Sequence, residues 1–275
     1  MCPHCRAFIT ANDKVCPYCN ERVGARAIDR RSDAPLLGGL IPQARFTTVM
    51  LLLVNLGLYA ATVIYSMKTG MGDAMGLDNR TLLFFGAKYA VFETGQWWRL
   101  VTAGFLHGGL MHILFNSWAL FDAGAAVDEV YGTNRMLVIY FVGSVCGFFL
   151  SSVWSERALS IGASAAICGL IGAMIAIGVR HRNPMGEAIR GAYIRWAIYI
   201  IVMGFIIPQI DNAAHVGGLA GGFGMGYLAG TPRYEGSPTE KLWKVCAWLC
   251  ILLTVVCFLK LYLWNIAFSR IMGMR

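Results

Sequence analysis

Long apolar runs recur along this chain and are separated by shorter polar segments. We place the runs at residues 46–67, 105–126, 134–154, 163–180, 191–207, 211–230 and 242–264. A helix of about 20 apolar residues crosses the hydrocarbon layer of a bilayer, so the pattern predicts seven membrane-embedded helices, of which the fourth and fifth are short. The composition agrees, because 14% of the residues are charged, whereas a soluble domain carries about 25%. We therefore expect an all-α, multi-pass membrane protein.

Basic residues are unevenly divided between the segments that connect the runs. With the N-terminus placed inside, fourteen Lys and Arg residues lie in or beside the inner segments and seven lie in the outer segments. Because cytoplasmic loops carry an excess of these residues, we predict a cytoplasmic N-terminus in a bacterial-type plasma membrane. An odd number of spans places Arg270 and Arg275 outside, against this rule. The net charge of +8 therefore need not indicate a nucleic-acid partner, because Lys and Arg concentrate at the ends and in the short loops, as membrane topology requires.

Two Cys-x-x-Cys pairs lie at the start of the chain, with Cys2 and Cys5 in the first and Cys16 and Cys19 in the second. Four thiolates in this arrangement match a tetrahedral Zn²⁺ site. The alternative, a redox dithiol, requires a thioredoxin-like βαβ unit for which the segment is too short. We therefore predict that residues 1–24 form a zinc-ribbon-like module, folded by its metal, in which His4 is not a ligand. A basic linker at residues 25–45 follows, and an unidentified cytosolic partner for the module is left open.

Four polar side chains lie within the apolar runs or at their ends. These are Ser164, His215 and the pair His112 and Asn116, which are four residues apart and therefore project from one face of a helix. At bilayer depth such groups must face each other or a wet cavity. One interpretation is that they only join neighbouring helices. A serine near a histidine is also the minimal set for nucleophilic catalysis, and the four residues together favour this second interpretation.

Each of these residues has a role in peptide hydrolysis. Ser164 attacks the peptide carbonyl, and His215 takes the serine proton and later gives it to the leaving amine. His112, Asn116 and the backbone N–H of Ser164 stabilise the developing oxyanion. Asp211 lies one turn before His215, but we expect it at the outer interface, which leaves a Ser–His dyad as the prediction.

Glycines follow the histidine at intervals of four residues, at Gly218, Gly222 and Gly226. Such a stripe allows two membrane helices to approach closely. We expect the sixth run to pack in this way against the fourth run, where Gly169 and Gly172 lie, and so to bring the histidine to the serine.

The motifs occur in an order that resembles the rhomboid family of intramembrane serine proteases, over about residues 46–230. The matching elements are Gln96-Trp97-Trp98-Arg99-Leu100, the His-x4-His-x3-Asn pattern from His107 to Asn116, Gly162-Ala163-Ser164-Ala165, and Ala214-His215-Val216-Gly217-Gly218. The resemblance implies a six-helix core with a Ser–His dyad that opens to the extracytoplasmic side, and it allows a seventh helix at the C-terminus. Ala165 stands where the family has Gly, and Cys168 stands where it has an aromatic residue that packs on the histidine. Both departures bear on catalytic efficiency.

We therefore predict a rhomboid-type protease core at residues 46–230, followed at residues 231–275 by a linker and an additional transmembrane helix. The predicted function is that of a serine endopeptidase which cleaves transmembrane protein substrates near the extracytoplasmic membrane boundary. Its partners are these substrates and membrane lipid, and it needs no cofactor for catalysis beyond the structural Zn²⁺ of the N-terminal module. The alternative is a catalytically weak or inactive rhomboid-like protein that binds or escorts transmembrane clients. A transporter is disfavoured, because we find no inverted repeat.

Overall fold

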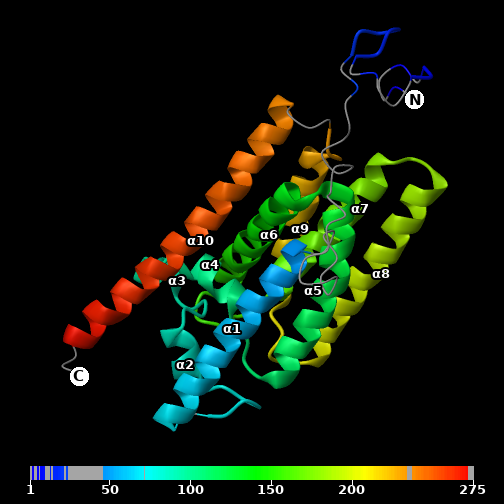
Figure 1. Ribbon diagram of the computed structural model, residues 1–275. Helices are drawn as coiled ribbons and strands as arrows, with labels where there is room; N and C mark the ends of the chain where they lie inside the picture. Colours follow the sequence, from blue (N-terminus) through cyan, green and yellow to red (C-terminus); the bar gives the residue numbers. More distant parts are fainter. Residues whose placement is uncertain are drawn as a thin grey trace, which may run out of the picture.

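The computed structural model describes residues 2, 5, 7–9, 13, 15–21, 23, 46–70, 72–233 and 237–271. The predicted linker at residues 25–45 and His4 lie outside these residues. The described residues form ten α-helices and one 3-10 helix and contain no β-strand, which confirms the all-α prediction. In chain order the helices are α1 (Phe46–Thr69), α2 (Asn79–Phe84), α3 (Val91–Thr94), α4 (Arg99–Thr102), η3 (Ala103–Phe105), α5 (Leu110–Tyr131), α6 (Thr133–Trp154), α7 (Ser164–Arg180), α8 (Pro184–Ile206), α9 (Asn212–Ala229) and α10 (Pro238–Ile271) (Figure 1).

The seven long helices correspond to the seven predicted runs, but two of the predicted starts are wrong. The second run begins as a helix only at Leu110, because the residues before it form η3 and a loop. The fifth run begins earlier than predicted, at Pro184. There the side chain of Asn183 accepts a hydrogen bond from the backbone N–H of Gly186 at 2.8 Å. An asparagine cap followed by proline at the first helical position is a strong start signal for a helix.

Among the described residues, five helices are long and apolar enough to cross a membrane, namely α1, α5, α6, α8 and α10. Helix α7 has only 17 residues, and α9 carries many glycines that lower its hydropathy. Helix α7 lies inside the bundle, where it packs against α5, α6, α8 and α9 and has most of its residues buried (Figure 1). A helix that is apolar on all sides belongs in a core. The arrangement is that of an integral membrane protein.

The segment between α1 and α5 folds into short helices around one buried guanidinium. Arg99 donates hydrogen bonds to the side-chain oxygen of Gln96 at 2.8 Å and to the carbonyl oxygens of Leu83 at 2.9 Å and Ala87 at 2.7 Å. The neighbouring Trp98 is buried as well. Because a buried polar group is tolerated only when it is hydrogen-bonded, these contacts fix the shape of the whole segment.

The C-terminal helix α10 is attached to α6 by a buried ion pair. Arg135 on α6 donates to both carboxylate oxygens of Glu240, at 2.6 and 2.7 Å. The guanidinium carbon also lies 5.3 Å from the centre of the Trp243 ring, and the backbone N–H of Arg233 donates to Glu240 at 2.9 Å. Charge-assisted bidentate hydrogen bonds are among the strongest in proteins, so this pair anchors one end of α10.

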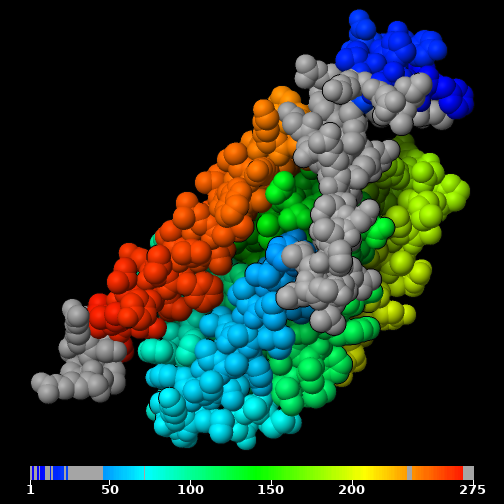
Figure 2. Space-filling view, in the orientation of Figure 1, coloured from blue at the N-terminus to red at the C-terminus, as the bar shows by residue number. Residues whose placement is uncertain are grey.

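The other end of α10 is held by a separate contact, in which the side-chain amide of Asn265 donates to the carbonyl oxygen of Phe84 at 2.8 Å. Between the two anchors, an apolar crevice of about 490 Å³ lies among α1, α6 and α10 and is lined by side chains such as Leu51, Phe141 and Val255. Figure 2 shows part of α6 exposed between α10 and α1. Helix α10 is therefore held by polar contacts at two places, while Cys257 and Leu261 between them are buried in the core.

We predict that the substitution Glu240→Ala lowers the free energy of unfolding by about 3–5 kcal/mol, because it leaves the buried Arg135 without its carboxylate partner. The control is Glu93→Ala, which breaks the solvent-exposed ion pair of Glu93 with Arg157. That change is expected to cost less than about 1 kcal/mol. Unfolding in mixed micelles with increasing SDS measures both variants, and equal effects would contradict the role of Glu240.

Candidate active site

Ser164 is the first residue of α7 and follows a turn that only glycine forms easily. Gly162 has a φ of +122°, a region that L-residues rarely adopt. A Cβ atom at this position would lie 2.8 Å from Nε2 of His112 and 3.5 Å from Oγ of Ser164. The backbone N–H of Gly162 donates to the carbonyl oxygen of Ala103 at 3.0 Å, which fixes the turn. The serine is thus presented at a helix N-terminus, beside the imidazole of His112.

His215 lies in the first turn of α9 and is buried. Its Nε2 atom is 3.0 Å from Oγ of Ser164, which is hydrogen-bond distance. If the ring accepts the serine proton at Nε2, the neutral ring carries its own hydrogen on Nδ1. No hydrogen-bond partner for Nδ1 is found among the described residues.

Helices α7 and α9 approach so closely that their backbones touch. A Cβ atom at Gly218 would lie 2.1 Å from the carbonyl oxygen of Ala165, and one at Gly222 would lie 1.9 Å from the carbonyl oxygen of Gly169. Any side chain at these two positions would force the helices apart. The predicted packing of the glycine stripe against α7 is therefore confirmed, and it determines the distance between the serine and the histidine.

His112 and Asn116 lie on α5, one turn apart, and differ in their hydrogen-bond partners. The Nδ1 atom of His112 accepts a hydrogen bond from the backbone N–H of Gly108 at 3.2 Å. This assigns the hydrogen of the neutral ring to Nε2, the atom that faces Gly162. The amide of Asn116 donates to the carbonyl oxygen of His112 at 2.9 Å. The structure thus places a histidine donor beside the serine, whereas the asparagine is bonded to its own helix.

Asp211 serves as the N-cap of α9 and makes no hydrogen bond to the histidine ring. One of its carboxylate oxygens accepts the backbone N–H of Ala214 at 3.0 Å, and the other accepts the hydroxyl of Ser151 on α6. Its backbone carbonyl accepts the N–H of His215 at 3.1 Å. The carboxylate therefore supports the helix that carries the histidine, as a cap at a helix N-terminus does.

Ala165 is accommodated by a glycine on another helix. A Cβ atom at Gly147 on α6 would lie 2.8 Å from the Cβ atom of Ala165 and 2.6 Å from the carbonyl oxygen of Ala214. The methyl group that departs from the family motif thus occupies the space left by Gly147. Sequence reasoning missed Gly147, although its spacing of four from Gly143 is the signal of a small-residue stripe. Cys168, the second departure, is fully buried on α7.

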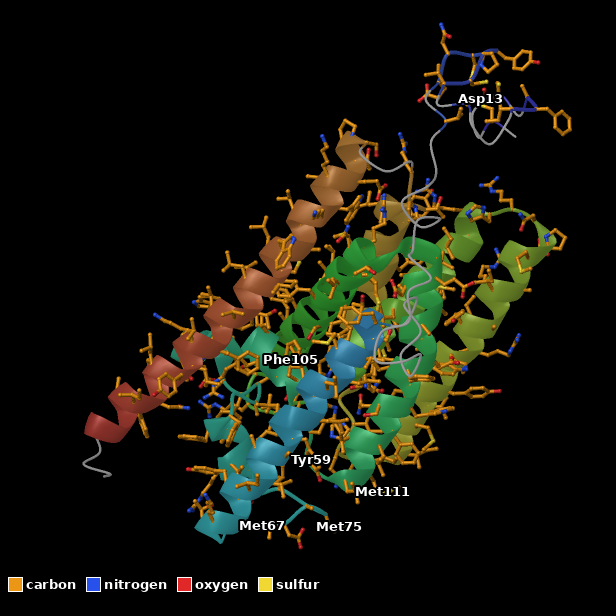
Figure 3. All side chains as sticks on the ribbon, viewed as in Figure 1. Asp13, Tyr59, Met67, Met75, Phe105 and Met111 are labelled. Atoms are coloured by element: carbon orange, nitrogen blue, oxygen red, sulfur yellow. The ribbon has the colours of Figure 1, made fainter. Side chains whose placement is uncertain are left out.

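The segment between α1 and α5 borders the end of the bundle where the site lies. The backbone N–H of Leu110 donates to the carbonyl oxygen of Ala74 at 2.9 Å, which ties this segment to the start of α5. Figure 3 shows Met67, Met75 and Met111 at this end of the bundle. All three side chains are exposed. Methionine is flexible and apolar, so this border can adapt its shape.

The four N-terminal cysteines form a separate cluster. The Sγ atoms of Cys2 and Cys19 are 3.6 Å apart, as are those of Cys5 and Cys16, and all four lie within 4.8 Å of one another. These separations exceed a disulfide bond of about 2.05 Å and are close to the edge of about 3.8 Å of a tetrahedron with Zn–S bonds of about 2.3 Å. The residues present therefore fit a metal ion, and this cluster can hold one.

The protons of these thiols compete with a metal ion. The backbone N–H of Glu21 lowers the pKa of Cys19, but desolvation and hydrogen bonds with the other three thiols together raise that pKa to about 12. Metal binding must therefore release protons, and the apparent metal affinity is expected to fall as the pH falls.

Comparison with known proteins defines the class to which this fold and site belong. The sequence profile of the rhomboid domain matches residues 94–232, which is half of the chain. The chain therefore belongs to the rhomboid family, and the resemblance seen in its motifs is confirmed.

Several curated proteins are similar to this chain. Rhomboid protease GluP of Bacillus subtilis (strain 168) is 38% identical over 157 residues, which cover 57% of this chain and 31% of that protein. Putative rhomboid protease YdcA of the same organism is 33% identical over 135 residues, which cover 49% of this chain and 68% of that protein. Inactive RHOMBOID-like protein 8 of Arabidopsis thaliana is 33% identical over 131 residues, which cover 47% of this chain and 37% of that protein. The chain spans about a third of GluP and half of RHOMBOID-like protein 7 of Arabidopsis thaliana.

We predict that Gly147→Ala lowers the free energy of unfolding by about 1–3 kcal/mol, because the new methyl group overpacks the contact among α6, α7 and α9. The double variant with Ala165→Gly should recover only part of this loss, since the carbonyl oxygen of Ala214 remains in the way. Gly224→Ala is the matched control, because a Cβ atom there meets nothing within 4 Å. SDS unfolding in micelles is the measurement, and a Gly147→Ala variant as stable as Gly224→Ala would refute the packing argument.

Proposed function

We propose that this protein is an intramembrane serine endopeptidase that cleaves transmembrane protein substrates by a Ser–His dyad. The observation that supports this most directly is the distance of 3.0 Å between Nε2 of His215 and Oγ of Ser164, on two helices of a membrane bundle. A serine hydroxyl is a weak nucleophile unless a neighbouring base accepts its proton, and this distance allows that transfer. Membership in the rhomboid family supports the same reaction.

The reaction proceeds in two stages. In the first stage, His215 takes the proton of Ser164, the serine oxygen bonds to the peptide carbonyl carbon, and the C–N bond breaks as His215 protonates the leaving amine. In the second stage, His215 takes a proton from water, the resulting hydroxide displaces the serine oxygen from the acyl group, and the proton returns to Ser164. No metal takes part in either stage.

Two donors near the serine stabilise the oxyanion. The Nε2–H of His112 faces the turn at Gly162, and the backbone N–H of Ser164 is the first of α7 and has no partner within the helix. The positive end of the α7 dipole acts in the same direction. Asn116 completes this set in our proposal, by donating its second amide hydrogen once substrate is present. Donors of this kind are worth about 10²–10³-fold in kcat each.

We further propose that the site opens to the extracytoplasmic side. With the N-terminus in the cytoplasm of a bacterial-type cell, α1 runs outward, α5 inward and α6 outward, so α7 begins at the outer side of the membrane. The serine at its N-terminus then cleaves near the outer boundary, where water is available. We retain the division into a module at residues 1–24, a linker at residues 25–45, a protease core at residues 46–230 and a C-terminal part at residues 231–275.

We predict that Ser164→Ala and His215→Ala each lower kcat for a model transmembrane substrate by at least about 10³-fold in proteoliposomes. Ser152→Ala and His181→Ala are matched controls. The hydroxyl of Ser152 bonds only to its own helix, at the carbonyl oxygen of Phe148, and His181 is exposed between α7 and α8. A serine-directed phosphonate should label the wild type and the two control variants, and it should fail to label Ser164→Ala and His215→Ala. Wild-type protein that cleaves no better than the two site variants, across several substrates, would refute the protease proposal.

A second candidate function is the binding or escort of transmembrane clients without cleavage. The similarity to Inactive RHOMBOID-like protein 8 favours this alternative. The same experiment separates the two, because a client-binding protein would retain a substrate helix in a crosslinking assay equally well in the wild type and in Ser164→Ala, with no cleavage by either. The intact pair of Ser164 and His215 supports the protease.

We also propose that the four N-terminal cysteines hold a structural Zn²⁺ ion. The metal would cross-link two short turns, one in which the N–H of Cys2 bonds to the carbonyl oxygen of Ala7, and one in which the N–H of Cys16 bonds to that of Glu21, both at 2.8 Å. Among the described residues of this segment, few side chains are buried with the cysteines, and Val23 is one of them. So small a cluster cannot stabilise a fold by itself, and metal binding supplies the missing free energy.

We predict about one zinc per chain in freshly purified, reduced protein, measured by elemental analysis. The double substitution Cys5→Ser and Cys16→Ser should abolish it, whereas Cys146→Ser, in α6, should leave it unchanged. The cleavage rate of the wild type should not depend on zinc in the reaction itself. A zinc content well below one per chain in the reduced wild-type protein would contradict the metal assignment.

A further inference from the structure

Lys88, between α2 and α3, is a charged side chain with 0% of its surface exposed. Its Nζ atom donates to the carbonyl oxygens of Ser151 at 3.2 Å, Ser155 at 2.5 Å and Ala158 at 3.0 Å. The three hydrogens of an ammonium group are thus matched by three acceptors. Among the described residues, no carboxylate lies within ion-pair distance of it. The lysine therefore binds backbone, at the C-terminal end of α6 and in the loop that follows.

The end of α6 is a favourable position for a cation, but burying the Lys88 ammonium group there would cost free energy without its carbonyl acceptors. The last carbonyls of a helix have no partner within the helix and carry its negative dipole end. Burial lowers the pKa of Lys88, while the nearby charges of Asp211 and Glu156 raise it. A buried ammonium group must be fully hydrogen-bonded to persist, and the three carbonyl acceptors meet that requirement here.

The first connection from Lys88 leads to the nucleophile. The backbone N–H of Lys88 donates to the carbonyl oxygen of Ser160 at 3.0 Å, and the N–H of Ser160 donates back to Lys88 at 3.1 Å. Ser160 stands four residues before Ser164, and between them lies the turn at Gly162. The segment that leads into the serine is thus paired with the backbone of the lysine.

The second connection leads to the base. Ser151, whose carbonyl oxygen accepts from Lys88, uses its hydroxyl to donate to the carboxylate of Asp211. Asp211 caps α9, and its backbone carbonyl accepts the N–H of His215. Lys88 therefore contacts the supports of both helices that carry the dyad, through different atoms of one residue.

We propose that Lys88 is a positioning residue that sets the alignment of Ser164 and His215 by joining the C-terminal end of α6 to the loop before α7. This rests on the proposed function, since the alignment matters for catalysis only if the pair is catalytic. Lys88 touches neither the substrate nor the reacting atoms. It acts through Ser151 and Asp211 on the histidine and through Ser160 on the serine.

The first test is kinetic and uses Lys88→Met, which keeps the apolar stem and removes the ammonium group. A misplacement of about 1 Å at a catalytic pair can cost about 10²-fold. We expect kcat to fall by about 10–100-fold while KM stays within about twofold, because the substrate-binding surface is unchanged. The control is Arg157→Gln, which removes a charge from the loop between α6 and α7 that Lys88 contacts. The Arg157 side chain is 73% exposed, and among the described residues its ion-pair partner is Glu93. The kcat of this variant should equal that of the wild type. A Lys88→Met enzyme with wild-type kcat, or one that changes KM alone, would overturn the proposal.

The second test does not depend on activity and uses hydrogen–deuterium exchange in nanodiscs. Lys88→Met should raise the exchange rate of amides in residues 158–166 and 211–217, with no change in residues 46–60 of α1. If Lys88→Met does not fold, Ser151→Ala provides a smaller change, which removes only the hydroxyl to Asp211 and should affect residues 211–217 alone. Exchange that is unchanged, or raised throughout the bundle, would refute positioning. Should the wild type prove inactive with the phosphonate probe, the proposed function fails while these exchange patterns still decide the role of Lys88.

Discussion

The contact between α7 and α9 is the constraint on which the rest of the site depends. At Gly218 and Gly222 the backbone of one helix lies where a side chain of the other would normally stand. In lipid there is little hydrophobic force between helices, so close van der Waals contact of this kind holds them together. Because the histidine lies in the first turn of α9 and the serine begins α7, the same contact brings a base to a nucleophile.

Buried cations organise the parts of the chain that are not long helices. Arg99 shapes the segment between α1 and α5, Arg135 anchors α10, and Lys88 joins the loop before α7 to the end of α6. All three donate to backbone carbonyl oxygens, and among the described residues Arg135 alone of the three also has a carboxylate partner. Carbonyl oxygens are the acceptors that irregular segments and helix ends leave free. A cation placed there satisfies several acceptors at once and fixes where the segment turns.

Ala165 and Cys168, the two residues that differ from the motif the sequence resembles, are both buried in the helix bundle. The methyl group of Ala165 occupies the space opposite Gly147, so the turn that presents the serine is kept. Cys168 is fully buried. The histidine nevertheless remains at hydrogen-bond distance from the serine. The residue after the serine thus packs against α6 as well as against α9.

Apolar run lengths and the spacing of polar residues are local properties, so the sequence by itself determined the seven helices, the cysteine pairs and the identity of Ser164 and His215 as candidate residues. The glycine stripe even predicted which helices would touch. The early start of α8 was decided by Asn183 and Pro184, a local cap that the hydropathy pattern had obscured. Only the tertiary structure decided the 3.0 Å between serine and histidine, which stand 51 residues apart. It also revealed the partners of Gly147, Lys88 and Arg135, because which distant residues meet depends on how the helices pack, and sequence spacing alone does not name the partner.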